Sequence, residues 1–394
     1  MASPFSIKNL QKVLPRLYAS LPFYLLPRYA LPPLHVYFEV TYRCNLRCDM
    51  CHFLEIIEDT EKNRRYKNEL SADAIKAVIA GLPRYAVITF TGGEAFMKSD
   101  FMEILDYAAS RNKVHIITNG TALNEAMVER LLRKRLRSLF GGGLFFLGVS
   151  LEGREELHDR ITTIPGSFRK TTAGLERLLK QRGRRRYPLV HLTCVINAAN
   201  VRDLPFLYDY ADRLGVDVCN FVLSNPATYW HGKDYDQTAY LQTPAVPVEP
   251  IASGVLREQL NLLEQKSRTH KTQLRYSPNY ITREEIVRYY ANQSSYEDYR
   301  CYAPWSKVGV SAYGDVFSCP HHRLGNVQDN DGGLAWNSAG HREFRQQVKD
   351  RKIFPGCLGC CQSEYVGAQE KIPEPVAQTA SGNIPLVPRL SVQE

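Results

Sequence analysis

The sequence contains no apolar run that approaches the roughly 20 residues needed to cross a bilayer. Its N-terminus also lacks the short apolar core, followed by a small-residue cleavage site, that marks a secretion signal. With 44% hydrophobic and 23% charged residues, the composition is that of a globular protein and not of a disordered chain. These absences favour a cytoplasmic protein, and 394 residues are enough for one large domain and a smaller one.

Positive charge exceeds negative charge, and the formal net charge is +9. Part of the excess lies in two basic runs, 130–137 and 180–187. Each run lies at or just beyond the end of a helix-like segment, where cations suit the helix dipole and solvent. We therefore interpret the runs as solvated faces. Contact with anionic lipid or nucleic acid is the alternative, and nucleic acid is not the partner we expect.

Ten cysteines would be an unusual number in a reducing compartment if they formed disulfides, so metal binding is the better interpretation. Two of them, Cys194 and Cys219, stand alone in apolar runs and are expected to be buried as small hydrophobic side chains. The other eight form two groups. One group is Cys44, Cys48 and Cys51, and the other is Cys301, Cys319, Cys357, Cys360 and Cys361.

From about residue 34 to 226, strand-like and helix-like segments alternate without longer internal repeats. Amphipathic stretches begin with capping residues such as Ser71, Ser99 or Asp100, Asn124 and Ser167. Six βα units in sequence predict an α/β fold, a partial (βα)6 TIM-type barrel with a parallel sheet. Its chemistry should gather on the loops that follow the strands. The predicted strands are 36–42, 86–92, 114–120, 145–151, 189–196 and 216–223.

The rest of the chain divides into four further segments. Residues 1–33 form an apolar, basic extension divided by prolines; it either packs across the barrel bottom or anchors the protein peripherally to a membrane surface. The Tyr-rich residues 227–300 are expected to bridge the barrel mouth and contact substrate, or else to form a surface layer. Residues 301–366 form a small cysteine-rich module with a hairpin at Tyr313-Gly314-Asp315, and residues 367–394 are expected to be disordered.

The first cysteine group has the spacing C-x3-C-x2-C directly after the first predicted strand. Three thiolates on one loop can hold three corners of a cubane iron–sulfur cluster and leave one iron open. A zinc site would need a fourth ligand nearby, and the adjacent His52 is not placed to complete a tetrahedron. The loop resembles the signature of the radical S-adenosylmethionine (SAM) superfamily. That resemblance implies a [4Fe–4S] cluster whose open iron is chelated by the amino and carboxylate groups of SAM.

The segment after the second strand extends this resemblance. Gly92, Gly93 and Glu94 are similar to the GGE motif that binds the SAM amino group in the family. Glycines allow close backbone approach, and a carboxylate can accept hydrogen bonds from an ammonium group. Ala95 stands where the family usually has proline. After the third strand, the resemblance places Thr118 and Asn119 beside the nucleoside.

Later motifs imply further SAM contacts. Ser150, at the end of the fourth strand, would contact the ribose or carboxylate, and Arg160 would pair with the methionyl carboxylate. Glu152 replaces the more frequent Asp of this motif, which leaves its role open. Three further positions would flank adenine by the same resemblance: Ile196, Asn197 and the backbone of Met50.

The C-terminal module resembles the SPASM/twitch type of auxiliary-cluster extension. Cys301 and Cys319 fit the spacing C-x12-G-x4-C through Gly314. A full SPASM array has enough cysteines for two clusters, whereas only three follow here, so we expect one auxiliary [4Fe–4S] cluster. The arrangement is similar to that of a twitch-type aminocyclitol dehydrogenase. It implies Cys301, Cys319, Cys357 and Cys360 as ligands and Cys361 as a spare or alternative ligand, and a structural zinc is the alternative.

The resemblance implies an enzyme of the radical SAM oxidoreductase or maturase type. One-electron reduction would cleave SAM to methionine and a 5′-deoxyadenosyl radical, which takes hydrogen from a substrate over the barrel mouth. An auxiliary cluster with four cysteine ligands has no open iron for substrate and would conduct electrons or serve as structure. A reductant such as flavodoxin or ferredoxin is expected. Candidate bases are His231, Asp234 and Asp236, but the catalytic residue is left unassigned.

A small metabolite or a peptide is the expected substrate, for oxidation or another biosynthetic modification. Only 43 residues precede Cys44, which disfavours a fused peptide-binding domain, although a separate partner could supply one. The alternatives are an enzyme that modifies lipid or nucleic acid, or a non-catalytic iron–sulfur electron carrier or scaffold. The carrier would explain the cysteines but not Glu94, Asn119, Ser150 and Arg160 after successive strands.

Overall fold

The structure is a computed structural model, and it describes residues 7–59, 68–138, 141–226, 246–319, 322–329 and 333–367. No helix in these segments has the length and apolar character needed to span a membrane. The candidate bases His231, Asp234 and Asp236 and the tail after residue 367 lie outside the described residues.

Ten strands form a single curved sheet. Their bounds are β1 (His35–Glu39), β2 (Val87–Thr91), β3 (Lys113–Thr118), β4 (Gly143–Ser150), β5 (Leu189–Ile196), β6 (Val218–Leu223), β7 (Gln273–Ser277), β9 (Lys307–Val310), β10 (Asp315–Cys319) and β11 (His322–Asn326). The order across the sheet is β11-β10-β9-β1-β2-β3-β4-β5-β6-β7. Strands β9 and β1 to β7 are parallel, and β10 and β11 complete the sheet in antiparallel fashion. A separate pair joins β8 (Tyr299–Arg300) to β12 (Glu364–Tyr365).

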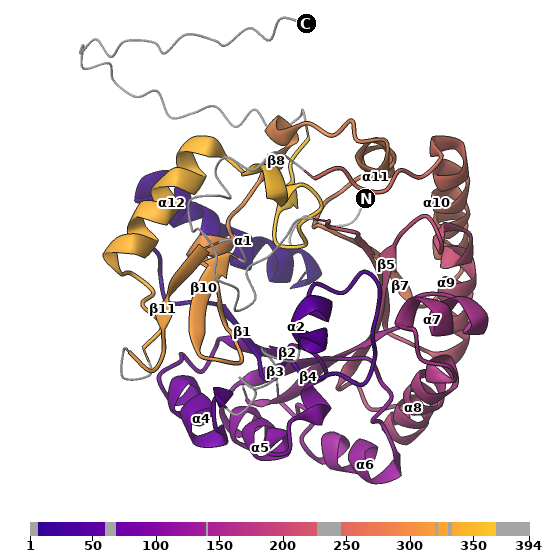
Figure 1. Cartoon of the computed structure of the whole chain (residues 1–394), viewed down its shortest axis with the longest axis horizontal. Helices are drawn as coiled ribbons and strands as arrows, with labels where there is room; N and C mark the ends of the chain where they lie inside the picture. Colours follow the sequence, from indigo (N-terminus) through magenta and orange to yellow (C-terminus); the bar gives the residue numbers. More distant parts are fainter. Residues whose placement is uncertain are drawn as a thin grey trace, which may run out of the picture.

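The six predicted strands correspond to β1 to β6, and the predicted partial barrel is confirmed (Figure 1). The sheet extends beyond the prediction, because β7 continues it after residue 226, in the segment where we expected the βα pattern to stop. The sequence QLRYS did not stand out as a strand because only one of its faces, with Leu274 and Tyr276, packs against the core. Its other face carries polar side chains.

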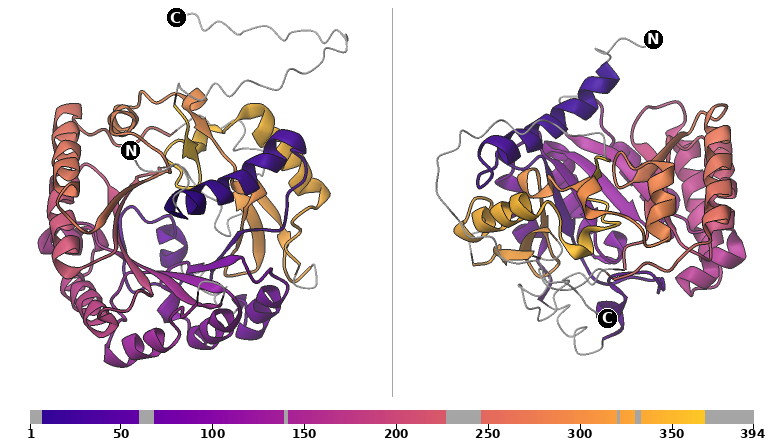
Figure 2. Two further views of the ribbon diagram at one scale, coloured as in Figure 1. Left: turned by 180° about the vertical axis from the view of Figure 1, so that it is seen from behind. Right: turned by 90° about the horizontal axis from the view of Figure 1, so that it is seen from above.

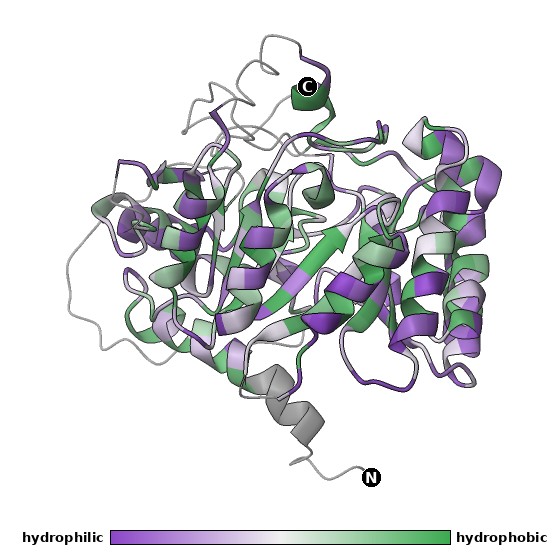
Figure 3. Ribbon diagram, turned by 90° about the horizontal axis from the view of Figure 1, so that it is seen from below, coloured by the Kyte–Doolittle hydropathy of each residue, from purple (hydrophilic) through white to green (hydrophobic). Residues whose placement is uncertain are grey.

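Helices cover the outer face of the sheet (Figures 1 and 3). Figure 3 shows that they carry both hydrophobic and hydrophilic residues, as expected for amphipathic helices that pack on a sheet. The longer ones are α4 (Ala72–Ala80), α5 (Phe101–Arg111), α6 (Glu125–Arg133), α7 (Glu155–Thr162), α8 (Ser167–Arg182), α9 (Leu204–Leu214), α10 (Ser253–Ser267) and α11 (Arg283–Tyr290). Short 3₁₀ turns span Ala95–Met97, Val201–Asp203, Tyr296–Asp298, Ala303–Trp305 and Pro355–Cys357.

The predicted helix caps are confirmed in part. Ser71 and Asn124 accept hydrogen bonds from the first turns of α4 and α6. Asp100 precedes α5, but its carboxylate accepts a hydrogen bond from Ala72 N at 3.1 Å instead of capping its own helix. The prediction for Ser167 was wrong: this residue is already helical, and its hydroxyl donates to Asp159 Oδ1 at 2.9 Å.

The N-terminal helix α1 (Ile7–Leu25) and the short helix α2 (Leu54–Glu58) lie at opposite ends of the barrel (Figure 2). The predicted division of this extension by prolines is wrong, because Pro15 and Pro22 lie inside one helix. Ala19 and Phe23 are buried against the cysteine-rich module, where Phe23 meets the Trp305 ring edge-on. The extension therefore packs across the barrel bottom, one of its two expected arrangements.

The cysteine-rich module is joined to the barrel by hydrogen bonds between strands. Strand β9 pairs in parallel with β1, and helix α12 (Ala339–Arg351) packs beside β11. The predicted hairpin is present: Ser311 N donates to Asp315 O at 2.8 Å, and Gly314 has a φ of +89° at the turn. Such a positive φ is readily available only to glycine.

Candidate active site

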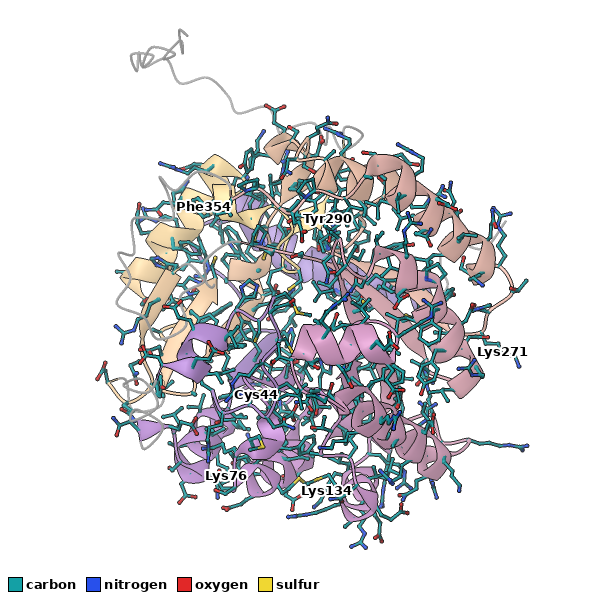
Figure 4. The ribbon with its side chains drawn as sticks, turned by 45° about the vertical axis from the view of Figure 1, so that its right-hand side comes forward. Cys44, Lys76, Lys134, Lys271, Tyr290 and Phe354 are labelled. Carbon is teal, nitrogen blue, oxygen red and sulfur yellow. The ribbon has the colours of Figure 1, made fainter. Side chains whose placement is uncertain are left out.

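The loop that carries Cys44, Cys48 and Cys51 connects β1 to α2, at the carboxyl end of the parallel strands. Figure 4 places Cys44 toward the middle of the molecule, whereas Lys76, Lys134 and Lys271 lie at the periphery. All three thiols are half-buried, and this burial raises the pKa of each. A bound metal would supply the positive charge that stabilises the thiolates. Leu46 N also donates to Cys44 Sγ at 3.4 Å.

The glycine pair after β2 lies directly against this loop. Gly93 N donates to Thr41 O, and Glu94 N donates to Arg43 O, both at 2.8 Å. A Cβ on Gly92 would come within 2.4 Å of Thr41 O, and one on Gly93 within 2.3 Å of Arg43 O. Both positions therefore require glycine, because the two backbones touch just before Cys44.

Helix α7 holds the other side of the cysteine loop. Arg47 N donates to Thr162 O and Asp49 N donates to Ile161 O, both at 3.1 Å. The Arg47 guanidinium also donates to Cys44 O at 2.8 Å, which fixes the loop internally. Arg160, an exposed residue of α7, lies next to Ile161 in the chain and hence near this contact. The loop is thus clamped between the Gly-Gly-Glu segment and α7.

Glu94 connects three of the predicted site residues. It is buried, its Oε1 accepts from Thr118 Oγ1 at 2.9 Å, and its Oε2 accepts from Asn119 N at 2.7 Å. Phe96 N also donates to Oε1, which leaves one acceptor position on Oε2. Burial raises the pKa of this carboxyl, and the three donors oppose that effect. The site fits a ligand that brings a cationic donor.

The remaining predicted residues line the adjoining strands. Ser150 ends β4 in register with Thr193, and Ile196 ends β5, where its carbonyl accepts from Tyr290 OH at 2.6 Å. Asn197 Oδ1 accepts hydrogen bonds from the next turn of its own loop. Met50 is half-buried within the cysteine loop. Within the described part of the chain, the side chains of these four residues form no hydrogen bond with Glu94. The structure therefore brings them only to the same end of the sheet.

Glu152, whose role the sequence left open, is buried just after β4. Its Oε2 accepts from Val195 N at 2.9 Å, and Asn200 Nδ2 donates to its backbone carbonyl at 3.0 Å. Burial, with a smaller contribution from the charge of Asp49, raises the pKa of this carboxyl to about 7. Sequence reasoning also missed Asn45 and Arg47, whose only signal was their position inside the cysteine motif.

Four cysteines gather in the C-terminal module. Burial raises the pKa of the Cys357 thiol well above its ordinary value, and the nearby Cys319, Cys301 and Cys360 raise it further. Burial and Cys360 likewise raise the pKa of Cys301 to about 12. Phe354 N donates to Cys357 Sγ at 3.2 Å. These are the four residues expected to bind the auxiliary cluster. As expected from their apolar runs, Cys194 and Cys219 are buried elsewhere.

Among the described residues, no three Cys, His, Asp or Glu side chains are placed to hold a single metal ion. Cysteine thiolates are the ligands of iron–sulfur clusters, and both cysteine groups supply them.

A partial parallel barrel with three thiols at its mouth and a four-thiol module on its edge defines a SAM-type iron–sulfur enzyme. Comparison with protein families supplies the assignment: residues 38–211 match the radical SAM superfamily, and residues 301–361 match the SPASM iron–sulfur cluster-binding domain. The chain belongs to the radical SAM superfamily and carries a C-terminal SPASM domain. Its cofactors are accordingly a [4Fe–4S] cluster, SAM and an auxiliary iron–sulfur cluster.

Curated relatives include enzymes of two kinds. The Fe-coproporphyrin III synthase of Methanosarcina barkeri is 34% identical over 181 residues, 45% of this chain and 41% of that protein. The AdoMet-dependent heme synthase of the same organism is 23% identical over 352 residues, 85% and 90% of the two chains. The PqqA peptide cyclase of Granulibacter bethesdensis is 30% identical over 188 residues, 47% and 45%. The chain thus spans less than half the length of the first and third of these relatives.

Solved structures share the fold. Streptococcus suis SuiB bound to its precursor peptide SuiA has a TM-score of 0.56 at 13% identity, covering 87% of this chain and 72% of that one. The protein anSMEcpe with bound AdoMet and Cp18Cys peptide has a TM-score of 0.53 at 17% identity, covering 84% and 88%. At these identities the likeness shows the fold alone.

Proposed function

We propose that this radical SAM enzyme abstracts hydrogen from a small-molecule or peptide substrate in an oxidation or another biosynthetic modification. The observation that carries the proposal is the contact of the Cys44 loop with Glu94 and Asn119 at the barrel mouth, where Glu94 also holds Thr118. When bound, the reduced cluster and SAM supply the one-electron chemistry that removes a hydrogen atom from a substrate.

The residues of the mouth would divide the binding of the cofactors. Cys44, Cys48 and Cys51 would hold the cluster, and the remaining acceptor position on Glu94 would take the SAM amino group. Around the rest of SAM, we assign Ser150 and Arg160 to the ribose and carboxylate, Thr118 and Asn119 to the nucleoside, and Met50, Ile196 and Asn197 to adenine. The clamp formed by Gly93 and α7 supports this arrangement, because it keeps the thiols in one position relative to Glu94.

In the SPASM domain, Cys301, Cys319, Cys357 and Cys360 would hold one auxiliary [4Fe–4S] cluster. A cluster with four protein ligands has no open iron, so it would transfer electrons from the substrate, with a flavodoxin or ferredoxin as the external donor. The buried surroundings of Cys357 support such a role, since a low-dielectric, hydrogen-bonded environment tunes the potential of a cluster.

The names of the relatives bear on the class of substrate. Heme synthesis and peptide cyclisation are the activities that their names record, and the heme synthase aligns with both domains of this chain. That coverage favours a small metabolite over a peptide.

We further propose a cytoplasmic protein with peripheral membrane contact through α1. Support comes from its exposed apolar side chains, which include Leu14, Leu17, Leu21 and Leu25.

The test is anaerobic formation of 5′-deoxyadenosine from SAM with a strong reductant. Wild type should form the product, and a Cys44/Cys48/Cys51 to Ala triple variant should form none. Cys219→Ala is the matched control, because this buried thiol lies outside both cysteine groups and its loss should not prevent product formation. A wild type that contains iron and sulfide but forms no 5′-deoxyadenosine would instead support a non-catalytic electron carrier.

A further inference from the structure

The barrel has an open seam. Its parallel strands begin at β9 and end at β7, and these two strands are not paired with each other in the described structure. The end of the SPASM domain fills the seam: Tyr365 N donates to Asn279 O at 3.0 Å, just after β7. The residues between Cys360 and Tyr365 therefore border the lumen where the barrel does not close.

Two cations border this seam, one on each of its edge strands. Arg275 of β7 donates from Nη2 to Asn279 Oδ1 at 3.1 Å, and Lys307 of β9 donates from Nζ to Gln362 Oε1 at 2.7 Å. Both acceptors are neutral amides, and neither cation forms an ion pair within the described residues. Their two partners lie close together, because Asn279 pairs with Glu364 and accepts from Tyr365 N, only two or three residues after Gln362. Both cations therefore border the short segment that follows Cys361.

The side chains of both cations project into the lumen of the barrel. Arg275 alternates along β7 with Leu274 and Tyr276, which pack on the core, so its side chain projects inward. Its charge reaches His115 and His191 on β3 and β5, and that of Lys307 reaches His35 on β1. The lumen is accessible, because Ile117 on the inward face of β3 is 40% exposed and Arg275 and Cys361 are exposed as well.

Three histidines and one carboxylate lie on the same inner face of the sheet. Burial, with smaller contributions from nearby cations, lowers the pKa of His35 and His115 to about 3 and that of His191 to about 4, so these rings are neutral near pH 7. Glu39, on the inward face of β1, accepts a hydrogen bond from Tyr42 OH at 2.7 Å. Cations without an ion-pair partner gain stability from an added anion, and an Arg fork matches an oxyanion well.

We propose that Arg275 and Lys307 bind an oxyanion of the substrate, a carboxylate or a phosphate, at the seam between β7 and β9. This inference rests on the proposed function and adds the chemical class of the substrate to it. An oxyanion held there would lie beside Cys361, next to a proposed ligand of the auxiliary cluster, and would leave the rest of the substrate in the lumen below the Cys44 loop.

Cys361 provides a probe for anion binding in the reconstituted enzyme. Its alkylation by anionic iodoacetate and by neutral iodoacetamide is followed by mass spectrometry of the Cys361 peptide. Taking the ratio of the two rates cancels the reactivity of the thiol itself. We expect the ratio to fall about tenfold in the double variant Arg275→Gln/Lys307→Gln, since cations that line a site raise the local concentration of anions there. An unchanged ratio, or a Cys361 that resists both reagents, would overturn the proposal.

Matched variants separate charge from folding. Arg275→Lys/Lys307→Arg keeps both charges and should keep the wild-type ratio, and Arg257→Gln, on the outer face of α10, should also leave it unchanged. Protection of the wild type against iodoacetamide by succinate alone would identify a carboxylate site, and protection by inorganic phosphate alone a phosphate site. Protection by neither would count against the proposal.

Wild-type 5′-deoxyadenosine formation, measured on the same preparation, tests the proposed function separately. Product together with an unchanged ratio would overturn the oxyanion site and leave the enzyme assignment intact. No product, together with a lower ratio in the double variant than in wild type, would support the oxyanion site and overturn the enzyme assignment.

Discussion

Replacement of Gly93 by alanine should disturb the cysteine loop more than any surface change nearby. The new Cβ would lie 2.3 Å from Arg43 O, 2.8 Å from Arg43 C and 2.9 Å from Tyr42 O, all of them backbone atoms that no rotamer change can move. The Gly-Gly-Glu segment and the loop must therefore separate, which breaks the hydrogen bonds from Gly93 N and Glu94 N.

The expected cost follows from those contacts. Two lost hydrogen bonds cost about 1 kcal/mol each, and carbonyls left unsatisfied in a buried contact add about 1–2 kcal/mol. Gly93→Ala should therefore lower the free energy of unfolding by about 3–4 kcal/mol. It should also empty the Cys44 site while sparing the SPASM domain, so that about four of about eight iron atoms per chain remain after reconstitution.

Chemical denaturation and iron analysis check both parts. Gly254→Ala is the control, because a Cβ at this position in α10 meets nothing within 4 Å, and added helix propensity should leave the protein equally or slightly more stable. The reasoning is refuted if Gly93→Ala retains wild-type iron content and unfolds within about 0.5 kcal/mol of wild type.

Four further predictions follow from the same structure. Glu94→Gln should weaken SAM binding at least about tenfold in equilibrium binding, because a neutral amide no longer attracts the SAM ammonium group; undiminished binding would contradict that assignment. The raised pKa of Glu152, about 7, means that its protonated form is favoured by folding, so its contribution is complete below about pH 4 and is lost as the pH rises through 7. Glu152→Gln should remove about 2–3 kcal/mol of that pH dependence in unfolding measured from pH 5 to 8, and parallel wild-type and variant curves would count against it. Asp159→Ala should cost about 1–2 kcal/mol of stability, because Asp159 accepts from Gly166 N and Phe168 N at the start of α8, and an unchanged denaturation midpoint would show that the cap is dispensable. Leu17→Glu/Leu21→Glu should abolish co-sedimentation with anionic vesicles at unchanged thermal stability, and retained sedimentation would exclude α1 as the contact.

Much of the barrel could be predicted because its strands are short apolar runs between amphipathic helices. Their core residues, such as Val36, Phe90 and Leu192, are fully buried. The cysteine loop and the Gly-Gly-Glu segment were recognisable because their chemistry depends on residue types at short spacing. Strand β7 was not recognised, since Arg275 and Gln273 alternate with its core residues and mask its apolar character.

Contacts between distant segments were beyond the reach of the sequence. The pairing of Glu94 with Asn119 joins the ends of two strands, and the clamp from Ile161 to Asp49 joins a helix to a loop more than 100 residues away. Such contacts depend on how the whole sheet curves, which no local pattern encodes. The cap of α8 was missed for a more local reason: it is provided by Asp159 of the preceding helix and not by Ser167, the serine at the start of the expected helix.

The pairing of β9 with β1 has a consequence for how the chain can be divided. In the intact protein β1 is an inner strand, with β2 on one side and β9 on the other. Removing the SPASM domain would leave β1, with its apolar residues Val36 and Phe38, as an open edge with unpaired backbone groups. Exposed edges of this kind recruit strands from other molecules and lead to aggregation. The domain that carries the second iron–sulfur site thus also protects the barrel from self-association. The barrel expressed without it should aggregate.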